Sequence, residues 1–534
     1  MNLIAGITRL KQRHKFLAPL AVFLISLISF GYLEWSPYIS DPDSFYHIKM
    51  ALLMSKFGII HNFPYLPFTV LKNIFIDHHL LYHALMIPFV TLLPPIIGAK
   101  IFQAIIASLL IVVFYFIISK LKIKFPLFFT LALLISPAFV FRMSLIKAQP
   151  LSLIILLTGL FFILKRKKLP LIILSFIYVW VYGGWIFLPV ICLIFIFVDA
   201  FDSATKDIPS ISSIFKTRNI ILFAKKFIVN LFSQKNIFLV GACWLGALAG
   251  IIINPYFPRN ISFYLVQTFQ IPFFVGNEIT LGSEWNPISQ ISFFTTLLLP
   301  LLLICLSLAM IHTYKPKLDI KSKLFLVLTI LFALATFKSQ RNIEYLTPIA
   351  IITSGIILTL IPTTLRFQED ADDFRKKILP FIKLNFLTIF IIIIFFSCLC
   401  SIMVNIKLAL GNNRFDRFEK ASAYISSQTR PGDIIYHSSW DEFPALFYFD
   451  DRVRYISGLD PTFLYLSNAQ LYQESNGLTF GKNPDQAYNI IKYHFQAKYV
   501  FAGTKWDKFI TAIDKDPRFQ KVYSDSNAIV YKVL

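Results

Sequence analysis

Long apolar runs alternate with short, mostly basic stretches over residues 1–404, and this pattern predicts membrane-spanning helices. A helix needs about 20 apolar residues to cross a bilayer core, and we expect about eleven crossings. A shorter run at residues 80–95 contains three prolines, so we expect it to lie at the membrane surface. The expected spans cover residues 16–33, 96–119, 125–140, 151–164, two that meet at 182–185 with the second ending near 200, 237–253, 291–311, 324–337, 343–365 and 384–404.

The basic clusters predict the orientation of these spans. Loops rich in Lys and Arg alternate with loops poor in them, which is the arrangement expected when the basic loops are cytoplasmic. We therefore expect a multi-pass protein of the cell membrane with a cytoplasmic N-terminus and two long outer loops, at residues 34–95 and 254–289. Residues 201–235 are expected to form a cytoplasmic loop with an amphipathic helix on the lipid surface.

The pattern changes after residue 404, where charged residues and turn formers become frequent. We divide the chain into a transmembrane domain, residues 1–404, and a small extracytoplasmic α/β domain, residues 405–534. Alternation of apolar and polar positions predicts strands at 433–436, 453–457, 498–502 and 528–533, and helices at 488–495 and 506–514.

Composition narrows the class of protein. Of 534 residues, 56% are hydrophobic and 15% are charged, which excludes an ordinary soluble domain. The net charge of +22 is spread over the loops instead of forming one basic face, so we expect no nucleic-acid partner. All five cysteines lie in apolar runs, so no disulfide framework is expected in the α/β domain.

Titratable residues concentrate in the first outer loop. Asp41 and Asp43 form a D-x-D pair, and oxygen ligands so spaced can hold a hard divalent cation. The structural alternative is a proline turn between two solvated acids. Asp77 and His79 follow at about the same membrane depth and favour a functional site, with Mg²⁺ or Mn²⁺ as the expected cofactor.

Two later residues are expected on the same side of the membrane. Arg341 follows a span and suits a phosphate, because its planar fork donates two hydrogen bonds. Glu284, in the second outer loop, could serve as a further ligand or clamp. The alternatives are a snorkelling arginine and a solvated loop acid. Acids and an arginine gathered at an outer surface suit a lipid-anchored phosphate.

These motifs resemble those of the GT-C membrane glycosyltransferases, and most closely the catalytic subunit of bacterial and archaeal oligosaccharyltransferase. The resemblance covers nearly the whole chain. Asp41-Pro-Asp43 stands where the family has its first D-x-D, and Arg341 matches an arginine that contacts the lipid-linked phosphate. Segments 180–187 (WVYGGWIF), 283–287 (SEWNP) and 438–443 (SSWDEF) resemble the W-G-G-Y-x-F, S-x-S-E-x-x-P and W-W-D-Y-G motifs.

The resemblance implies transfer of a sugar or oligosaccharide from a polyprenyl (pyro)phosphate carrier to a protein, lipid or glycan acceptor at the outer membrane surface. It implies a polytopic α-helical fold with a small C-terminal α/β domain. The expected site residues are Asp43, Asp77 and His79 for the metal, Asp41, Asp43 and Glu284 for catalysis, Arg341 and Lys147 for the lipid phosphate, and Trp440 and Asp441 for the acceptor.

One departure from the family opens an alternative. Lys147-Ala-Gln149 stands where the family carries its second acidic pair, and a lysine cannot hold a cation. A metal-independent transferase using a polyprenyl monophosphate sugar is therefore the second hypothesis, with Asp41 or Asp43 as the base and Lys147 as an extra phosphate contact. From other classes, a transporter or flippase would place charges near the bilayer midplane. A non-catalytic envelope assembly protein would leave the clustered acids and imidazoles without a role.

Overall fold

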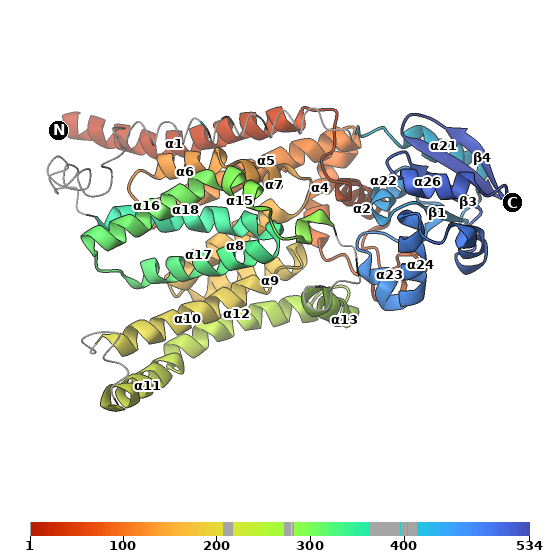
Figure 1. Ribbon diagram of the computed structural model, residues 1–534. Helices are drawn as coiled ribbons and strands as arrows, with labels where there is room; N and C mark the ends of the chain where they lie inside the picture. Colours follow the sequence, from red (N-terminus) through yellow and green to blue (C-terminus); the bar gives the residue numbers. More distant parts are fainter. Residues whose placement is uncertain are drawn as a thin grey trace, which may run out of the picture.

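The computed structural model describes residues 2–206, 217–271, 279, 282–361, 396, 399, 403 and 414–534. Long apolar helices run side by side in one bundle, and an α/β region covers one end of it (Figure 1). The N-terminus lies at the opposite end of the bundle from the C-terminus (Figure 1).

Six helices in the described part of the chain are long and apolar enough to cross a membrane, and two bent helix pairs raise this number to eight. The protein is therefore a multi-pass membrane protein, while the count of about eleven crossings stays a prediction. The predicted span at 384–404 and the predicted domain boundary after residue 404 lie outside the described residues, apart from single positions in the span. The six helices are α1 (Asn2–Glu34, apolar from Phe16), α5 (Pro95–Lys120), α10 (Phe187–Thr205), α12 (Gln234–Ile252), α17 (Ile320–Lys338) and α18 (Ile343–Leu360).

Two of the predicted spans, at 125–140 and 291–311, coincide with bent helix pairs. Helices α6 (Pro126–Leu134) and α7 (Pro137–Ser144) meet at 69°, and α15 (Gln290–Thr296) and α16 (Leu298–Tyr314) meet at 78°. Proline explains both breaks, because its ring clashes with the carbonyl four residues earlier and cannot continue a helix. Pro137 begins α7, and Pro300 lies in the first turn of α16.

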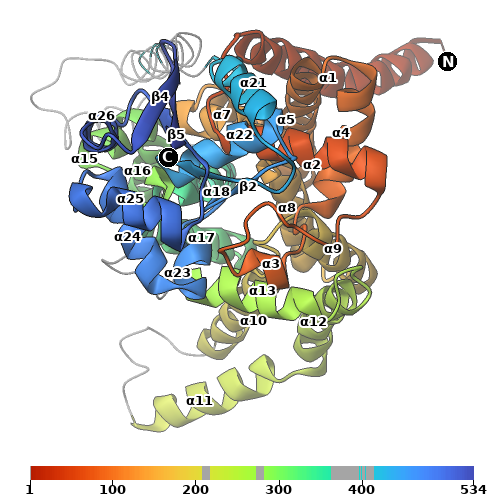
Figure 2. The same cartoon turned by 90° about the vertical axis from the view of Figure 1, so that its right-hand side faces the viewer.

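Three shorter apolar helices complete the bundle: α4 (Leu80–Leu92), α8 (Gln149–Leu164) and α9 (Lys168–Val181). Helix α9 packs along α12, where a Cβ added at Gly246 or Gly250 would overlap the backbone of α9. Small residues four apart allow this close approach between helices in a membrane. The predicted amphipathic helix is present as α11 (Thr217–Leu231), which packs on α10 and projects from the bundle (Figure 2).

The first outer loop folds over the end of the bundle. It contains α2 (Asp43–Phe57), α3 (Leu71–Ile74) and then α4. Helix α2 packs against α4 on one side and against α22 (Phe443–Phe449) of the C-terminal region on the other. In the second outer loop lie α13 (Arg259–Leu265), a π-helical turn η2 (Val266–Gln270) and a 3₁₀ turn η3 (Ser283–Trp285).

The C-terminal region holds a five-stranded sheet in the order β2-β1-β3-β5-β4. The four predicted strands are present as β1 (Ile434–His437), β2 (Arg454–Tyr455), β3 (Tyr499–Gly503) and β5 (Ala528–Val533). Strands β2, β1 and β3 are parallel, and β5 and β4 (Phe519–Ser524) are antiparallel. We did not predict β4, because it is an edge strand with mostly solvent-facing positions. The helices of the C-terminal region are α21 (Glu419–Gln428), α22, α23 (Thr462–Ser467), α24 (Ala469–Thr479), α25 (Ala487–Asn489) and α26 (Asp507–Asp514). Helix α25 continues into the π-helical turn η7 (Ile490–His494).

Specific contacts dock this α/β region on the first outer loop. The backbone N–H of Tyr455 donates to the carbonyl oxygen of Tyr65 at 2.8 Å, and the N–H of Val70 donates to the carbonyl oxygen of Phe463 at 3.1 Å. The Lys49 ammonium on α2 donates to the Tyr448 carbonyl oxygen at 3.1 Å. The first outer loop and the sheet are thus held together as two walls of one site.

Candidate active site

A cavity of about 1230 Å³ lies between the end of the helix bundle and the α/β region. Pockets for small ligands usually measure about 300–1,000 Å³, so this cavity has room for more than one small substrate. Its walls come from every segment that the sequence singled out. The predicted residues that line it are Asp41, Asp43, His79, Lys147, Glu284, Arg341, Trp440 and Asp441, whereas Asp77 lies behind the wall, next to His79.

Asp41 and Asp43 share one partner, Lys147. The Lys147 ammonium lies 2.8 Å from a carboxylate oxygen of Asp41 and 2.8 Å from one of Asp43. The Asp41 side chain also accepts the backbone N–H of Asp43 at 2.9 Å, which fixes the turn into α2. Asp43 stands in the first turn of that helix, where a negative charge is favoured by the helix dipole. We call these three residues the carboxylate–lysine cluster.

The surroundings of Asp43 change its acidity. One third of its side chain is exposed (33%), and Asp43 lines the cavity. Burial raises the pKa of Asp43 to about 6, against the opposing effect of Lys147 and with a further rise from Asp41. Burial disfavours the Lys147 ammonium, but the Asp41 and Asp43 carboxylates outweigh it and hold the pKa of Lys147 above its usual range. The cluster therefore joins a permanent cation to a carboxylate that titrates near neutral pH.

Two arginines and two glutamates form a second ionic network beside this cluster. The Arg142 guanidinium donates to Glu344 at 3.0 and 2.8 Å and to Glu284 at 2.7 Å. Burial works against the Glu284 charge, but the nearby cations, Lys147 first, hold the pKa of Glu284 below its usual range. Glu284 is thus an ionised anchor of the cavity wall. Sequence reasoning gave Arg142 no role, although an arginine within an apolar stretch is a signal for a functional or paired charge.

Arg341 also lines the cavity. Its guanidinium stacks 4.4 Å from the centre of the Trp285 ring and donates to the Tyr182 hydroxyl at 3.0 Å. A Glu284 oxygen is 3.9 Å away. An arginine carries five N–H donors, so most of its hydrogen-bonding capacity remains for a ligand in the cavity. Its plane is held by Trp285 and Tyr182, which orients those donors.

Four residues of the first outer loop form an imidazole cluster: Asp77, His83, His47 and His79. Asp77 pairs with Nδ1 of His83 at 2.7 Å, and Nε2 of His83 lies 2.8 Å from Nδ1 of His47. Nδ1 of His79 lies 3.1 Å from the carbonyl oxygen of Val181. The His47 and His79 rings are 5.1 Å apart, and both residues line the cavity.

The predicted metal ligands are not assembled as a metal site. Within the described ranges, no group of three or more His, Cys, Asp or Glu side chains is placed to hold a metal ion. Asp77 accepts from His83 and from the backbone of His79, and Asp43 contacts the Lys147 ammonium. The set Asp43, Asp77 and His79 therefore does not fit Mg²⁺ or Mn²⁺, because a fixed positive charge already occupies the space between the D-x-D carboxylates.

The carboxyl ends of the parallel strands β1 and β3 form the roof of the cavity, a usual ligand position in parallel sheets. Trp440 and Asp441 follow β1, and Lys505 and Trp506 follow β3. Lys505 pairs with Asp441 at 2.5 Å. A buried Glu442 holds the two strand ends together by accepting the Gly503 N–H at 2.9 Å. The sequence identified only the β1 half, since nothing local marks Lys505 and Trp506 as neighbours of Asp441.

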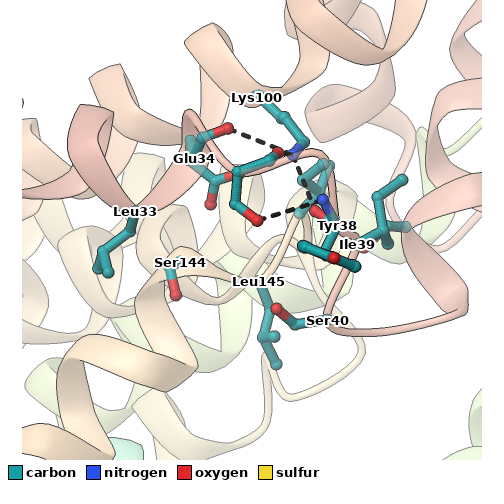
Figure 3. Close-up of a pocket in the computed structure, with 11 residues that line it drawn as sticks. Leu33, Glu34, Tyr38, Ile39, Ser40, Lys100, Ser144 and Leu145 are labelled. Atoms are coloured by element: carbon teal, nitrogen blue, oxygen red, sulfur yellow. Dashed lines mark hydrogen bonds between the residues drawn. The ribbon is translucent and has the colours of Figure 1, made fainter. Parts of the chain in front are cut away.

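A small polar pocket lies behind the D-x-D turn (Figure 3). There the Lys100 ammonium of α5 donates to the carbonyl oxygens of Glu34, Ser36 and Tyr38 at 3.2, 2.5 and 2.8 Å. These three bonds use all the donors of the ammonium group. They fix the chain between α1 and Asp41, so the D-x-D pair is carried by a tethered turn.

No protein-family profile and no curated protein matches this sequence. Solved structures do match its fold. The archaeal oligosaccharyltransferase AglB from Archaeoglobus fulgidus, in complex with an inhibitory peptide and a dolichol-phosphate, has a TM-score of 0.60 at 13% identity over 98% of this chain and 74% of that one. The Archaeoglobus fulgidus oligosaccharyltransferase in complex with Zn and sulfate has a TM-score of 0.58 at 13% identity over 96% and 73%. ArnT from Cupriavidus metallidurans bound to undecaprenyl phosphate has a TM-score of 0.56 at 12% identity over 97% and 98%.

The likeness to these membrane glycosyltransferases extends over nearly the whole chain. At such low identity it shows a common fold. The resemblance predicted from the sequence motifs is confirmed at that level, and chemistry has to be argued from this chain's own cavity.

Proposed function

We propose that the protein is a glycosyltransferase that moves a sugar from a polyprenyl phosphate carrier to an acceptor at the outer membrane surface. The observation that carries this proposal is the single cavity that joins Arg341, the carboxylate–lysine cluster and the strand ends of the α/β region. The neighbours add support, because one was solved with a dolichol-phosphate and another with undecaprenyl phosphate.

Arg341 binds the phosphate of the carrier in this proposal. Its stacked, oriented guanidinium matches the geometry of phosphate oxygens through paired hydrogen bonds. The phosphate leaves with the electron pair of its bond to the sugar C1 atom, and its growing charge is stabilised by fixed cations at the cavity wall. Lys147 is the second cation, held at the cavity wall by Asp41 and Asp43.

Asp43 acts as the general base. A carboxylate that titrates near pH 6 combines a useful ionised fraction at neutral pH with appreciable basicity. Asp43 takes the proton of the acceptor group while the acceptor atom bonds to C1 of the sugar. Asp41 orients the acceptor, and Glu284 keeps the two arginines of the wall in place. Because the residues do not fit a divalent cation, this proposal is the metal-independent alternative.

The acceptor enters from the roof. Trp440 and Trp506 offer apolar ring surface there, and the Asp441–Lys505 pair offers both hydrogen-bond acceptors and donors. Such a surface suits a protein, lipid or glycan acceptor with a polar group near an apolar one. The α/β region thus presents the acceptor to a donor held by the membrane part.

The proposal is tested by mass spectrometry of lipid-linked sugars and envelope glycans from cells with the gene, without it, and with Asp43→Asn. We expect one lipid-linked sugar to accumulate, and one glycosylated product to disappear, both without the gene and with Asp43→Asn. Asp451→Asn, which changes a carboxylate near α2 outside the cavity, should behave as wild type. An unchanged lipid-linked pool and unchanged glycans in cells lacking the gene would contradict the proposal.

A further inference from the structure

Asp460 lines the cavity but has no part in the proposed transfer step. It belongs to the loop that follows β2, and β2 is parallel to β1. Ligands of parallel sheets bind at the carboxyl ends of the strands, and the loops after β1 and β3 already line the cavity there. The loop after β2 therefore supplies a third part of the roof, and Asp460 is the acidic residue of that loop.

A strained turn places Asp460 at the cavity. The Asp460 N–H donates to the Gly458 carbonyl oxygen at 2.8 Å, which closes a γ-turn around Leu459. Leu459 has a φ of +65°, a left-handed conformation that a leucine rarely adopts. Gly458 has no room for a side chain, because an added Cβ would overlap the Phe443 ring. Such strain persists only where the surrounding structure enforces it, and it clusters at ligand sites.

Asp460 keeps most of its hydrogen-bonding capacity for a ligand. One of its carboxylate oxygens accepts the backbone N–H of Thr462 at 2.8 Å, at the start of α23. A carboxylate has about four lone-pair sites, so most of them remain after this contact. Burial raises the pKa of Asp460, and the contacts with Thr462 and the Arg341 cation oppose that rise. Asp460 and Arg341 thus belong to the same part of the cavity.

Aromatic and apolar surface adjoins this carboxylate. The Phe463 N–H donates to the Asp460 carbonyl oxygen at 3.2 Å, and the centre of the Phe463 ring lies 6.1 Å from that of Phe263 on α13. Helix α23 lies beside α13 (Figures 1 and 2). Leu459, Phe463 and Phe263 all line the cavity. Apolar surface beside a carboxylate suits a sugar, whose C–H face is apolar and whose hydroxyl groups donate hydrogen bonds.

The carboxylate selects among the groups that enter the cavity. Phosphate diesters and carboxylates are negatively charged at neutral pH and offer no hydrogen-bond donor to Asp460, whereas hydroxyl and amino groups do. An acceptor also carries such groups. The transferred sugar, however, is joined to the carrier phosphate and therefore lies next to Arg341 in the proposed complex. The position of Asp460 near Arg341 favours the sugar as its ligand.

We propose that the Asp460 carboxylate binds hydroxyl or amino groups of the transferred sugar, with the γ-turn around Leu459 holding it in position. This inference rests on the proposed function, and it adds a specificity determinant to it. The sugar class that fits is neutral or basic, because Arg341 is engaged by the phosphate and a carboxylate on the sugar would be repelled by Asp460. A carrier lipid without a sugar makes no use of Asp460.

The test compares two ligands of the full-length protein in detergent: undecaprenyl phosphate, and the lipid-linked sugar purified from cells lacking the gene. We expect wild type to bind the sugar-bearing lipid more tightly than undecaprenyl phosphate. Asp460→Asn should weaken binding of the sugar-bearing lipid about tenfold, the difference between a charge-assisted and a neutral hydrogen bond. Binding of undecaprenyl phosphate should not weaken, since the removed charge contacts only the sugar.

The asparagine substitution also separates binding from a structural role. An asparagine oxygen accepts the Thr462 N–H as an aspartate does, so the turn into α23 is kept. Asp451→Asn, outside the cavity lining, should bind both lipids as wild type does. If Asp460→Asn does not fold, carbodiimide labelling of carboxylates in wild type still tests the contact. The sugar-bearing lipid should lower the labelling of Asp460, and undecaprenyl phosphate should not.

Several results would overturn the subsite while leaving the proposed function intact. These are equal affinity of wild type for both lipids, unchanged sugar-lipid binding in folded Asp460→Asn, labelling of Asp460 that the sugar-bearing lipid does not lower, and a carboxylate on the accumulated sugar. A higher KM for the acceptor with unchanged sugar-lipid binding would assign Asp460 to the acceptor instead. Failure of the proposed function would be seen in cells, as an unchanged pool of lipid-linked sugar.

Discussion

The two aspartates of the carboxylate–lysine cluster lie on the same loop, residues 34–95, as the imidazole cluster, and members of both clusters line the cavity, but the two clusters differ in how their charges are paired. Asp41 and Asp43 share an ion-pair partner, Lys147, which lies on a different segment. In the imidazole cluster Asp77 accepts hydrogen bonds from His83 and from the backbone of His79, and burial holds the pKa values of His47 and His79 below their usual range.

The difference indicates that one loop contributes both charged groups and imidazole groups to the cavity. Charges beside the bond that breaks can stabilise a transition state, because that is where charge develops. Imidazole rings on the cavity wall can make hydrogen bonds to polar groups without carrying a fixed charge. The two clusters are joined by α2, which carries Asp43 on its first turn and His47 one turn later. The following changes break or sharpen this division, from the largest expected effect to the smallest.

Removing the proposed base should have the largest effect. Asp43→Asn should lower the rate of sugar transfer about 10²- to 10⁴-fold, the usual contribution of general base catalysis. The asparagine cannot take the acceptor proton, while its size and position are kept. Turnover of the purified lipid-linked sugar measures the change, with Asp451→Asn as the matched control. A transfer rate within threefold of wild type would show that Asp43 is not the base.

Removing the cation should destabilise the charged cluster but not the imidazole cluster. Lys147→Met leaves two close carboxylates unpaired, and breaking such a buried pair costs about 3 kcal/mol of folding free energy. Thermal unfolding in EDTA should show the loss, and Mn²⁺ should restore part of it, because the freed oxygens can then hold a hard cation. Lys505→Met, at a more exposed pair, should show a much smaller loss and no response to Mn²⁺. Equal stability of wild type and Lys147→Met would contradict the pairing.

Replacing Arg341 by lysine tests whether phosphate binding needs the paired N–H donors of a planar guanidinium or only a positive charge. Arg341→Lys keeps the charge but loses the stack on Trp285 and the paired donors. We expect about tenfold weaker binding of undecaprenyl phosphate, the equivalent of one strong hydrogen bond. Arg518→Lys, at an arginine outside the cavity lining, provides the comparison. Unchanged affinity would assign the phosphate to another residue.

The pH dependence should produce the smallest effect. A carboxyl pKa raised to about 6 means that Asp43 is protonated, and inactive as a base, below that pH. The transfer rate should therefore rise with pH and reach half its maximum near pH 6. His79 adds no second inflection above pH 5, because burial lowers its pKa to about 4. A profile that is flat from pH 5 to 8, or an inflection that persists in Asp43→Asn, would contradict this assignment.

Much of the fold could be read from the sequence, because apolar runs and alternating patterns report burial directly. The apolar helices and four of the five strands follow from it. The prediction gave no bends within the spans at 125–140 and 291–311, since a proline in an apolar run is compatible with a kink or a break. Strand β4 was missed because its exposed edge carries little pattern.

The candidate site also contains residues that could be predicted from the sequence and residues that could not. Asp41, Asp43, Glu284 and Arg341 could be placed at one membrane surface from the sequence, since each follows an apolar run with a defined direction. The sequence could not show which residues contact these four. Lys147 stands where an acidic pair was expected, and only the bend between α6 and α7 and the turn that follows bring it between the two aspartates.

By itself the sequence determined that this protein crosses a membrane several times, that it carries acids, imidazoles and an arginine at the ends of its apolar runs, and that an α/β region follows them. The tertiary structure alone decided which of these groups are charged, which are neutral and which are neighbours. The physical reason is that Coulomb and hydrogen-bond energies depend on separations of a few ångströms. Residues from different segments reach such separations only when helices, turns and sheet have packed together.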